Sequence, residues 1–289
     1  MDSINRVAKM KNLKKVFLLV LSSALIAGCS GGEKFGSIEN NQNNSSEEFE
    51  VPSVIENLGF NLSTFDPATG FAGDLKIKGI KIPIAPENDP NKEFLNESYK
   101  YLMSKYGAIE MNRPDVQMSF FLPLGTKVRS MISGTVCDVP KLYSDDFSIR
   151  IAPTGLNCFP EGQGGASVLF EHEHVINPSV NYGDAVSAGQ VIAEVSDYRK
   201  DWKSQGLGIV EIGVFFSKKE STSPWHACPM KFLAPDKKME ILRDLNSAYS
   251  AWENELDNPD LYDESAEFPG CATLEDITDS NNASTGQQG

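Results

Sequence analysis

The sequence predicts a compact, mainly β domain of antiparallel strands, with a C-terminal helix behind it and a small α+β segment in front. Between residues 128 and 216, short runs of apolar and β-branched residues alternate with clusters of Gly, Pro, Asn and Asp, which is typical of all-β domains. Residues 236–256 instead repeat apolar side chains at helical spacing. Residues 31–48 contain few apolar side chains, so no folded core is expected there.

Residues 1–28 are predicted to be a lipoprotein signal peptide. Basic residues up to Lys15 precede a short apolar core, Val16–Leu25, which is too short to span a bilayer stably. Small residues then lead to Cys29 in the order seen in the bacterial lipoprotein cleavage box. This resemblance implies cleavage before Cys29 and attachment of acyl chains such as palmitate to it. The alternative is an ordinary signal peptide in which Cys29 occurs by chance.

The chain after the signal is predicted to stay on the membrane through its lipid. Ser30, rather than Asp, follows Cys29, which by resemblance to Gram-negative sorting rules favours the periplasmic face of the outer membrane. Loss of residues 1–28 removes five basic residues and one acidic residue, so the formal net charge changes from −14 to −18. Because so acidic a chain repels phosphate groups, we expect no nucleic-acid partner. Residues 29–50 are predicted to be a flexible tether.

Residues 51–114 are predicted to form a small pre-domain. Residues 74–83 alternate between apolar and polar side chains, which indicates one or two strands. Residues 91–106 carry apolar and aromatic side chains at roughly helical spacing and predict a short helix. The β-rich part then follows, with a Ser133-Gly134 turn or bulge inside its first run. Its expected strands are residues 128–136, 148–152, 167–171, 190–195 and 208–216.

The C-terminal part is predicted to be a docked helix followed by a polar tail. Residues 234–274 contain the predicted helix, whose apolar stripe is expected to pack on the β domain. The alternative is that the stripe binds a partner. Residues 275–289 are mostly polar and are predicted to be disordered. The stripe consists of Met239, Leu242, Leu245, Tyr249 and Trp252.

Four cysteines remain after Cys29, and an even number in an exported protein predicts two disulfides. Three connectivities are possible. We favour Cys137–Cys158, which would tie neighbouring strands, and Cys228–Cys271, which would pin the tail. A zinc–cysteine site is the alternative, but no CxxC spacing supports it.

The most specific pattern of the chain begins at His174. Val180 follows His174 by six residues, and residues 183–192 then read Gly-Asp-Ala-Val-Ser-Ala-Gly-Gln-Val-Ile. Three further blocks stand upstream and downstream: residues 125–136 with Gly-Thr-Lys-Val and Gly-Thr-Val, the apolar run 208–216, and residues 228–233 with Cys-Pro-Met-Lys-Phe-Leu.

These blocks and their order resemble the lysostaphin/LytM-type zinc metallopeptidases (metallopeptidase family twenty-three) over residues 115–233. The resemblance implies a compact antiparallel β-sandwich, a barrel-sandwich hybrid. It also implies a zinc held by a His-x-x-x-Asp motif and by the second histidine of a His-x-His motif, with two more histidines that handle protons. Zinc in such a site keeps one position for water and acidifies that water.

The chain departs from this pattern where the metal would bind. On the alignment, the first ligand falls on Asp115 and the aspartate on Ser119, while Ile209-Val210-Glu211 replaces His-x-His. His174 keeps the place of a catalytic histidine. Since the family pattern needs four histidines and this chain has three, the standard zinc site is absent.

An atypical metal site is the alternative. On a strand, the His172-Glu173-His174 sequence would place both imidazoles on one face, and Asp115 and Glu211 could then complete a zinc site. Otherwise His172 packs in the core, His174 lies in an open groove, and no cofactor is needed. Because an unpaired buried carboxylate is costly, we expect Glu211 to face the groove or to pair with a histidine.

The main functional hypothesis is a cell-envelope lipoprotein whose LytM-like domain is non-catalytic and binds cell-wall peptide (peptidoglycan) or regulates a wall hydrolase. The first alternative is an active zinc metalloendopeptidase that uses Asp115, Glu211 and either His174 or His172. The second alternative is a barrel-sandwich adaptor of an envelope complex, although the sequence has no long heptad hairpin of the kind that efflux adaptors use.

Overall fold

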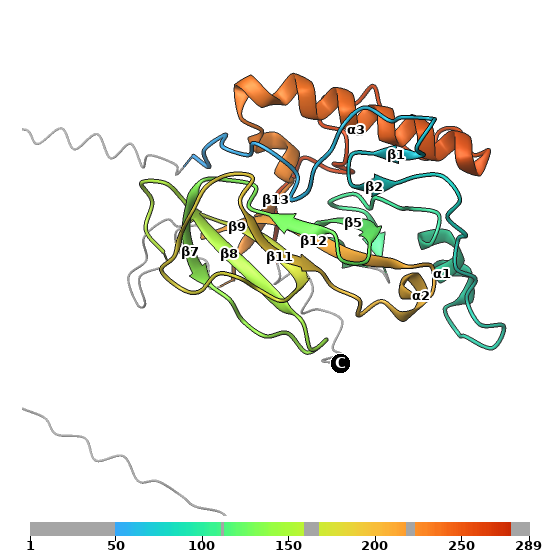
Figure 1. Cartoon of the computed structure of the whole chain (residues 1–289), viewed down its shortest axis with the longest axis horizontal. Coiled ribbons are helices and arrows are strands. Elements are labelled where there is room, and N and C mark those ends of the chain that lie inside the picture. The colour runs from blue at the N-terminus through green and yellow to red at the C-terminus, as the bar shows by residue number, and fades with distance from the viewer. Residues whose placement is uncertain (1–49, 111–112, 159–167, 218–222, 279–289) are drawn as a thin grey trace, which may run out of the picture. The chain divides into compact units, whose positions relative to one another are not determined.

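The structure, a computed structural model, describes residues 50–110, 113–158, 168–217 and 223–278 (Figure 1). The predicted signal peptide, Cys29 and nearly all of the tether lie outside these residues. The helices are α1 (Lys92–Ser98), α2 (Lys200–Lys203), α3 (Pro235–Leu256) and the 3-10 turn η1 (Pro229–Phe232). The strands are β1 (Phe71–Ala72), β2 (Leu75–Lys76), β3 (Ile109–Glu110), β4 (Arg113–Pro114), β5 (Met118–Pro123), β6 (Lys127–Arg129), β7 (Gly134–Asp138), β8 (Phe147–Pro153), β9 (Val168–Ile176), β10 (Ala185–Val186), β11 (Val191–Val195), β12 (Leu207–Phe216), β13 (Trp225–Ala227) and β14 (Ile277–Thr278).

A ten-stranded sheet organises the molecule. Its main path runs β10-β7-β8-β9-β12-β13-β14, with β5 paired to β12 and β11 paired to β6 and β9. Each of these pairings is antiparallel. The predicted mainly β, antiparallel fold is therefore confirmed. Strands are present in all the runs expected from β-branched residues, although the run 128–136 is divided into β6 and β7. Gly134, at the start of β7, lies in close contact with the Ala152 carbonyl of β8, where a Cβ atom would not fit.

The apolar core lies on one face of β5, β12 and β9. Phe60 from the N-terminal segment packs on Phe120 of β5 with 4.9 Å between ring centroids. Figure 1 shows α3 and the β1–β2 hairpin on the same side of the molecule. Residues 51–114 therefore pack into the same compact unit as the β domain, and they supply part of its core.

The segment after α1 departs from the predicted helix over 91–106. The helix ends at Ser98, and the chain then runs along β5, where the Ser104 N–H donates to the Ser119 carbonyl and the Phe121 N–H to the Leu102 carbonyl. Pairing with a strand edge satisfies these backbone groups and outweighs the local helical spacing. The predicted strands over 74–83 are also shorter in the structure, where Leu75–Lys76 forms a separate two-stranded sheet with Phe71–Ala72.

Helix α3 matches its prediction within one residue, and most of its stripe is buried. Leu245, Tyr249 and Trp252 are fully buried, and the Trp252 indole N–H donates to the Lys100 carbonyl at 2.7 Å. Met239 was predicted to share this face, but it is 77 % exposed because the packed face begins only at Ile241. Of the described helices, none is long and apolar enough to cross a membrane.

The C-terminal tail is more ordered than predicted. Ile277 and Thr278 form β14 against β13, so the predicted disorder from residue 275 is wrong for these residues. Residues 279–289 lie outside the described part. The Tyr106 hydroxyl fixes this end, because it donates to the His226 carbonyl at 2.8 Å and accepts from the Ile277 N–H at 3.1 Å. The two disulfides join the expected pairs, Cys137–Cys158 and Cys228–Cys271.

We predict that Trp252→Ala lowers the free energy of unfolding by about 3–5 kcal/mol, because it leaves a large cavity and an unpaired Lys100 carbonyl. Met239→Ala on the same helix is the matched control and should change it by less than about 0.5 kcal/mol. Urea denaturation of both variants measures this. Equal losses would mean that α3 is not anchored through Trp252.

Candidate functional site

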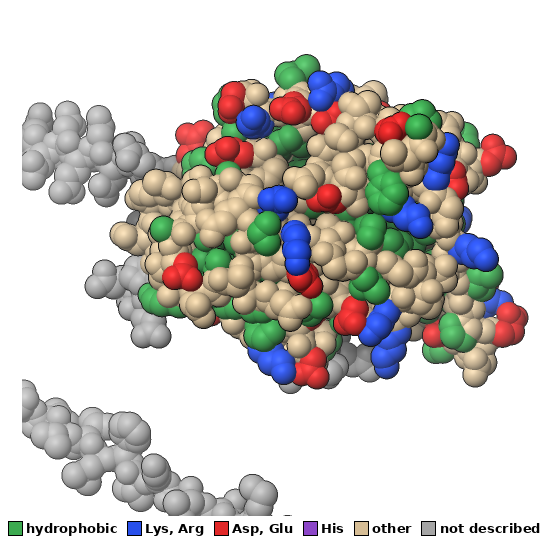
Figure 2. Space-filling model, viewed as in Figure 1, with side chains coloured by type: hydrophobic (Ala, Val, Ile, Leu, Met, Phe, Trp, Pro, Cys, Tyr) green, Lys and Arg blue, Asp and Glu red, His purple; other side chains and the backbone are tan. Residues whose placement is uncertain are grey.

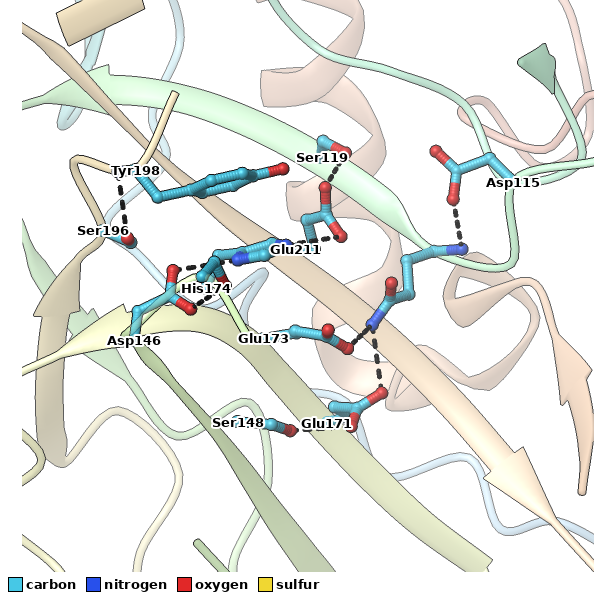
Figure 3. A network of polar contacts seen from close by, with 12 residues as sticks. Asp115, Ser119, Asp146, Ser148, Glu171, Glu173, His174, Ser196, Tyr198 and Glu211 are labelled. Carbon is cyan, nitrogen blue, oxygen red and sulfur yellow. Dashed lines mark hydrogen bonds and ion pairs between the residues drawn. The ribbon is translucent and has the colours of Figure 1, made fainter. Parts of the chain in front are cut away.

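A row of polar side chains crosses the sheet on the face opposite the apolar core. Glu211 of β12 lies directly opposite Ser119 of β5 on one side and Glu173 of β9 on the other. Directly opposed residues of antiparallel strands share a face, so these three side chains point the same way (Figure 3). The Ser119 hydroxyl donates to Glu211 Oε1 at 3.1 Å. The alignment had placed Ser119 and Glu211 at ligand positions, and the structure brings both together.

A bulge in β9 separates the two histidines that were expected on one face. His174 has a φ of 55°, and the β8–β9 register shifts here: Phe147 opposes Val175, while Ile149 opposes His172. The extra residue redirects the side chain, as bulges do. His172 lies opposite Ile212 on the core face, whereas the His174 ring reaches Glu211. The expectation of a one-faced His-x-His pair is therefore wrong.

His174 is held in one orientation at the site. Its Nδ1 lies 2.9 Å from Asp146 Oδ2, and its ring stacks on Tyr198 with 4.1 Å between centroids. Because a carboxylate accepts, Nδ1–H donates to Asp146, which leaves Nε2 facing Glu211 Oε2 at 3.8 Å. Burial lowers the pKa of His174, and the hydrogen bond to Asp146 opposes this shift. The imidazole is thus a positioned, mainly neutral group.

His172 has a structural role. Its ring is fully buried, and Nε2 accepts a hydrogen bond from the Met131 N–H at 3.1 Å. Burial lowers the pKa of His172 to about 4, so the ring is neutral over the physiological range. The ring lies on the core face, so the structure does not bring His172 together with Glu211, its predicted partner in a metal site.

Sequence reasoning missed the polar network beside Glu211. Gln117 Nε2 donates to Glu171 at 3.0 Å and to Glu173 at 2.8 Å. Gly213 opposes Glu171 and leaves the room that Gln117 uses, since a Cβ there would lie 3.1 Å from Gln117 Cγ. The alternation of Glu171 and Glu173 within an apolar strand was a usable signal. Asp146 and Gln117 had none, because they reach the site through long-range contacts.

Three carboxyl groups of this face have raised pKa values. Burial is the main cause for each. It raises the pKa of Asp115 to about 7, with smaller contributions from the charges of Glu110 and Glu173. It also raises the pKa of Glu173 to about 7, helped by the charge of Glu171. The pKa of Glu211 is raised well above its usual value by burial and then by Asp115 and Glu173. Negative charge is therefore costly at the centre of the site.

The side chains present do not fit a zinc ion. Zinc sites use three or four N, O or S ligands around one point, and within the described residues no group of three or more His, Cys, Asp or Glu side chains has that geometry. His174 and Glu211 meet at 3.8 Å, but His172 is on the other face and the Asp115 carboxylate accepts from the Gln117 N–H at 3.0 Å. The predicted ligand set is thus not assembled.

A cavity of about 320 Å³ opens above Glu211. Its floor is the sheet, at Ser119, Ile209 and Glu211, and one wall is the segment from α1 to β3. The later part of the 51–114 segment therefore borders the groove. The remaining lining residues are Phe94, Leu95, Ser98, Tyr99, Tyr101, Ser104, Glu110, Phe121, Tyr198, Arg199, Asp201 and Trp202.

Aromatic side chains give the cavity rigid walls. Trp202 of α2 is buried and stacks on Phe121 with 4.4 Å between ring centroids. The rings of Tyr99 and Trp202 form a T-shaped pair with 6.3 Å between centroids. Arg199 forms an ion pair with Asp201 at 3.1 Å and lies over the Phe121 ring. Trp202 is therefore both a lining residue of the cavity and part of the packed core.

Comparisons with known proteins show similarity at the level of solved structures. No protein-family model matches the sequence, and no curated protein is significantly similar to it. The solution structure of lysostaphin matches at 20 % identity and a TM-score of 0.33, over 46 % of this chain and 48 % of that one. The catalytic domain of lysostaphin from Staphylococcus simulans matches at 20 % identity and a TM-score of 0.32, over 46 % of this chain and 88 % of that one.

A third similar structure is the SpoIIIAH and SpoIIQ complex, at 14 % identity and a TM-score of 0.29, over 56 % of this chain and 99 % of that one. The chain thus spans about half the length of the whole lysostaphin that it matches. Of these similar structures, the lysostaphin domain is the catalytic domain of an antimicrobial peptidase, and the third is a complex of two proteins.

We predict that the buried carboxyl groups make the protein less stable as the pH rises. With folded pKa values of Glu173 and Asp115 near 7 and that of Glu211 raised further, the folded state holds more protons than the unfolded state above pH 4.5. The free energy of unfolding should therefore fall from about pH 5 to pH 8. Glu211→Gln should weaken this fall and be more stable at pH 8 by about 1 kcal/mol or more.

Urea denaturation at pH 5, 6, 7 and 8 measures this dependence. Glu240→Gln, on an exposed position of α3, removes the same charge outside the site and should keep the wild-type profile. Parallel profiles for wild type and Glu211→Gln would show that Glu211 is not protonated in the folded state.

Proposed function

We propose that this chain is a cell-envelope lipoprotein whose β domain binds cell-wall peptide, or the wall hydrolase that acts on it, without cleaving peptide bonds. The observation that carries the proposal is the Ser119–Glu211 hydrogen bond on the floor of an aromatic cavity. The motif alignment expects two zinc ligands at these two positions. A hydroxyl–carboxyl pair there favours recognition over metal-dependent hydrolysis.

The small number of imidazoles near Glu211 supports a non-catalytic site. Zinc peptidases need imidazole or carboxylate ligands that leave one coordination position for water. Here Nδ1–H of His174 donates a hydrogen bond to Asp146. Nε2 faces Glu211, whose carboxyl group accepts a hydrogen bond from Ser119. With His172 in the core, one imidazole remains beside Glu211. A zinc-bound water therefore has no matching set of ligands among these side chains.

The cavity supports a binding role. Its volume of about 320 Å³ is within the range of small-ligand sites. Rigid aromatic walls such as Phe121, Trp202 and Tyr99 supply contact area at a low entropic cost. A side chain or chain end of a wall peptide would fill this space. The α1–β3 segment lies beside the cavity and would contact a bound peptide.

The test uses the purified full-length chain with insoluble peptidoglycan and with zinc. We expect the protein to co-sediment with peptidoglycan, to release no new amino groups from it, and to retain well under one zinc per chain after zinc loading and gel filtration. Since His174 is not a ligand in this proposal, His174→Ala should leave the zinc content unchanged. One zinc per chain, with cleavage that disappears in Glu211→Ala, would establish the metalloendopeptidase alternative instead.

We also propose attachment to the periplasmic face of the outer membrane through acyl chains on Cys29. Several acyl chains make such anchoring stable, whereas one chain gives weak binding. Cys29→Ser should therefore move the protein from the membrane fraction to the soluble periplasmic fraction and abolish incorporation of labelled palmitate. Cys137→Ser is the matched control and should remain lipidated. Membrane retention of Cys29→Ser would contradict lipid anchoring.

A further inference from the structure

The cavity above Glu211 combines a carboxyl floor with aromatic walls. Side chains of Tyr99, Phe121, Tyr198 and Trp202 line it around Glu211. Aromatic faces attract cations through their quadrupole, and the attraction strengthens in a desolvated site. The same rings bury an aliphatic stem favourably. A cationic group on an apolar stem therefore matches both parts of this lining.

The charges of the lining favour a cation over an anion. Its basic side chain is Arg199, whose guanidinium is already paired with Asp201 at 3.1 Å. Burial, and then the nearby Asp201 carboxylate, raise the pKa of Tyr99 to about 12. Glu211 is in a different position: the largest charges acting on it come from Asp115 and Glu173, which have the same sign. Within the described lining, no unpaired cation therefore favours the charged form of Glu211, and an ammonium group placed beside it would supply that charge.

The hydrogen bonds of Glu211 leave room for a ligand. Oε1 accepts from Ser119, while Oε2 is 3.8 Å from His174 Nε2, which is longer than a hydrogen bond. A carboxylate can accept about four hydrogen bonds. An ammonium group above Glu211 could donate to Oε2, and the His174 Nε2 lone pair could accept a second of its three hydrogens.

We propose that this cavity binds the side-chain primary ammonium of a peptide, with the ammonium on Glu211 and its methylene stem between the aromatic walls. The inference rests on the proposed function, that the domain binds peptide, and it specifies which chemical group is recognised. Partner proteins and free polyamines carry the same group, and the experiment separates these sources.

The experiment measures binding of three probes to the full-length chain by calorimetry at pH 7.5: Ala-Lys-Ala capped at both ends, the same peptide with an acetylated lysine side chain, and 1,5-diaminopentane. Acetylation removes the charge and leaves the stem. We expect it to weaken binding at least tenfold. Equal affinities for the two peptides would overturn the proposal without any question of variant folding.

Variants assign the site. Glu211→Gln keeps the shape of the side chain. It should weaken binding of the lysine peptide at least tenfold and leave binding of the acetylated peptide unchanged. Glu240→Gln should affect neither. If diaminopentane binds as tightly as the lysine peptide, a free polyamine is the ligand, and the proposal that the cavity recognises a peptide side chain is wrong. If peptidoglycan binds wild type and Glu211→Gln equally, the proposed function stands and the ammonium site is wrong. If neither wild type nor Glu211→Gln binds peptidoglycan or the lysine peptide, both proposals are wrong.

Discussion

Strand β12 pairs with β5 on one side and with β9 on the other, and Glu211 lies where these three strands run side by side. Antiparallel pairing places opposed side chains on one face, so Ser119 and Glu173 must flank Glu211 once this register forms. The same register turns Ile212 and His172 into the core. One strand thus fixes the polar floor of the cavity and the apolar centre of the domain.

The buried carboxyl groups of the cavity floor cost folding free energy. Burial and mutual repulsion raise the pKa of Glu211, Asp115 and Glu173, which means that their charged forms are disfavoured in the folded protein. Hydrogen bonds from Ser119 and Gln117 offset part of this cost. Apolar side chains would stabilise such a position more simply. The presence of these carboxyl groups at a position where they cost stability is therefore a reason to assign them a binding role.

The segment in front of the β domain belongs to the site as much as the sheet does. Its N-terminal part covers the core face through Phe60, and its later part forms the cavity wall through Tyr99. The backbone of residues 102–104 pairs with β5. Tyr106 then fixes the C-terminal tail near β13. The segment thus contacts the sheet and the C-terminal tail, and its residues between Phe94 and Glu110 form part of the cavity wall.

The sequence by itself determined the mainly β architecture, the long helix and most of the longer strands after residue 128, because these depend on patterns between near neighbours. The β-branched run 208–216 became β12, and the helical spacing over 236–256 became α3 within one residue. The same information identified Glu211 as a polar side chain at odds with its strand. Local patterns also predicted a one-faced pair at His172 and His174, and there the prediction failed.

Only the tertiary structure decided what surrounds Glu211. The bulge at His174 depends on how β8 and β9 align, and it turns one imidazole toward Glu211 and leaves the other in the core. Asp146 and Tyr99 reach the site from distant segments, so no spacing along the chain reveals them. Side-chain contacts across a sheet follow from register and bulges, which are set by the packing of the whole domain.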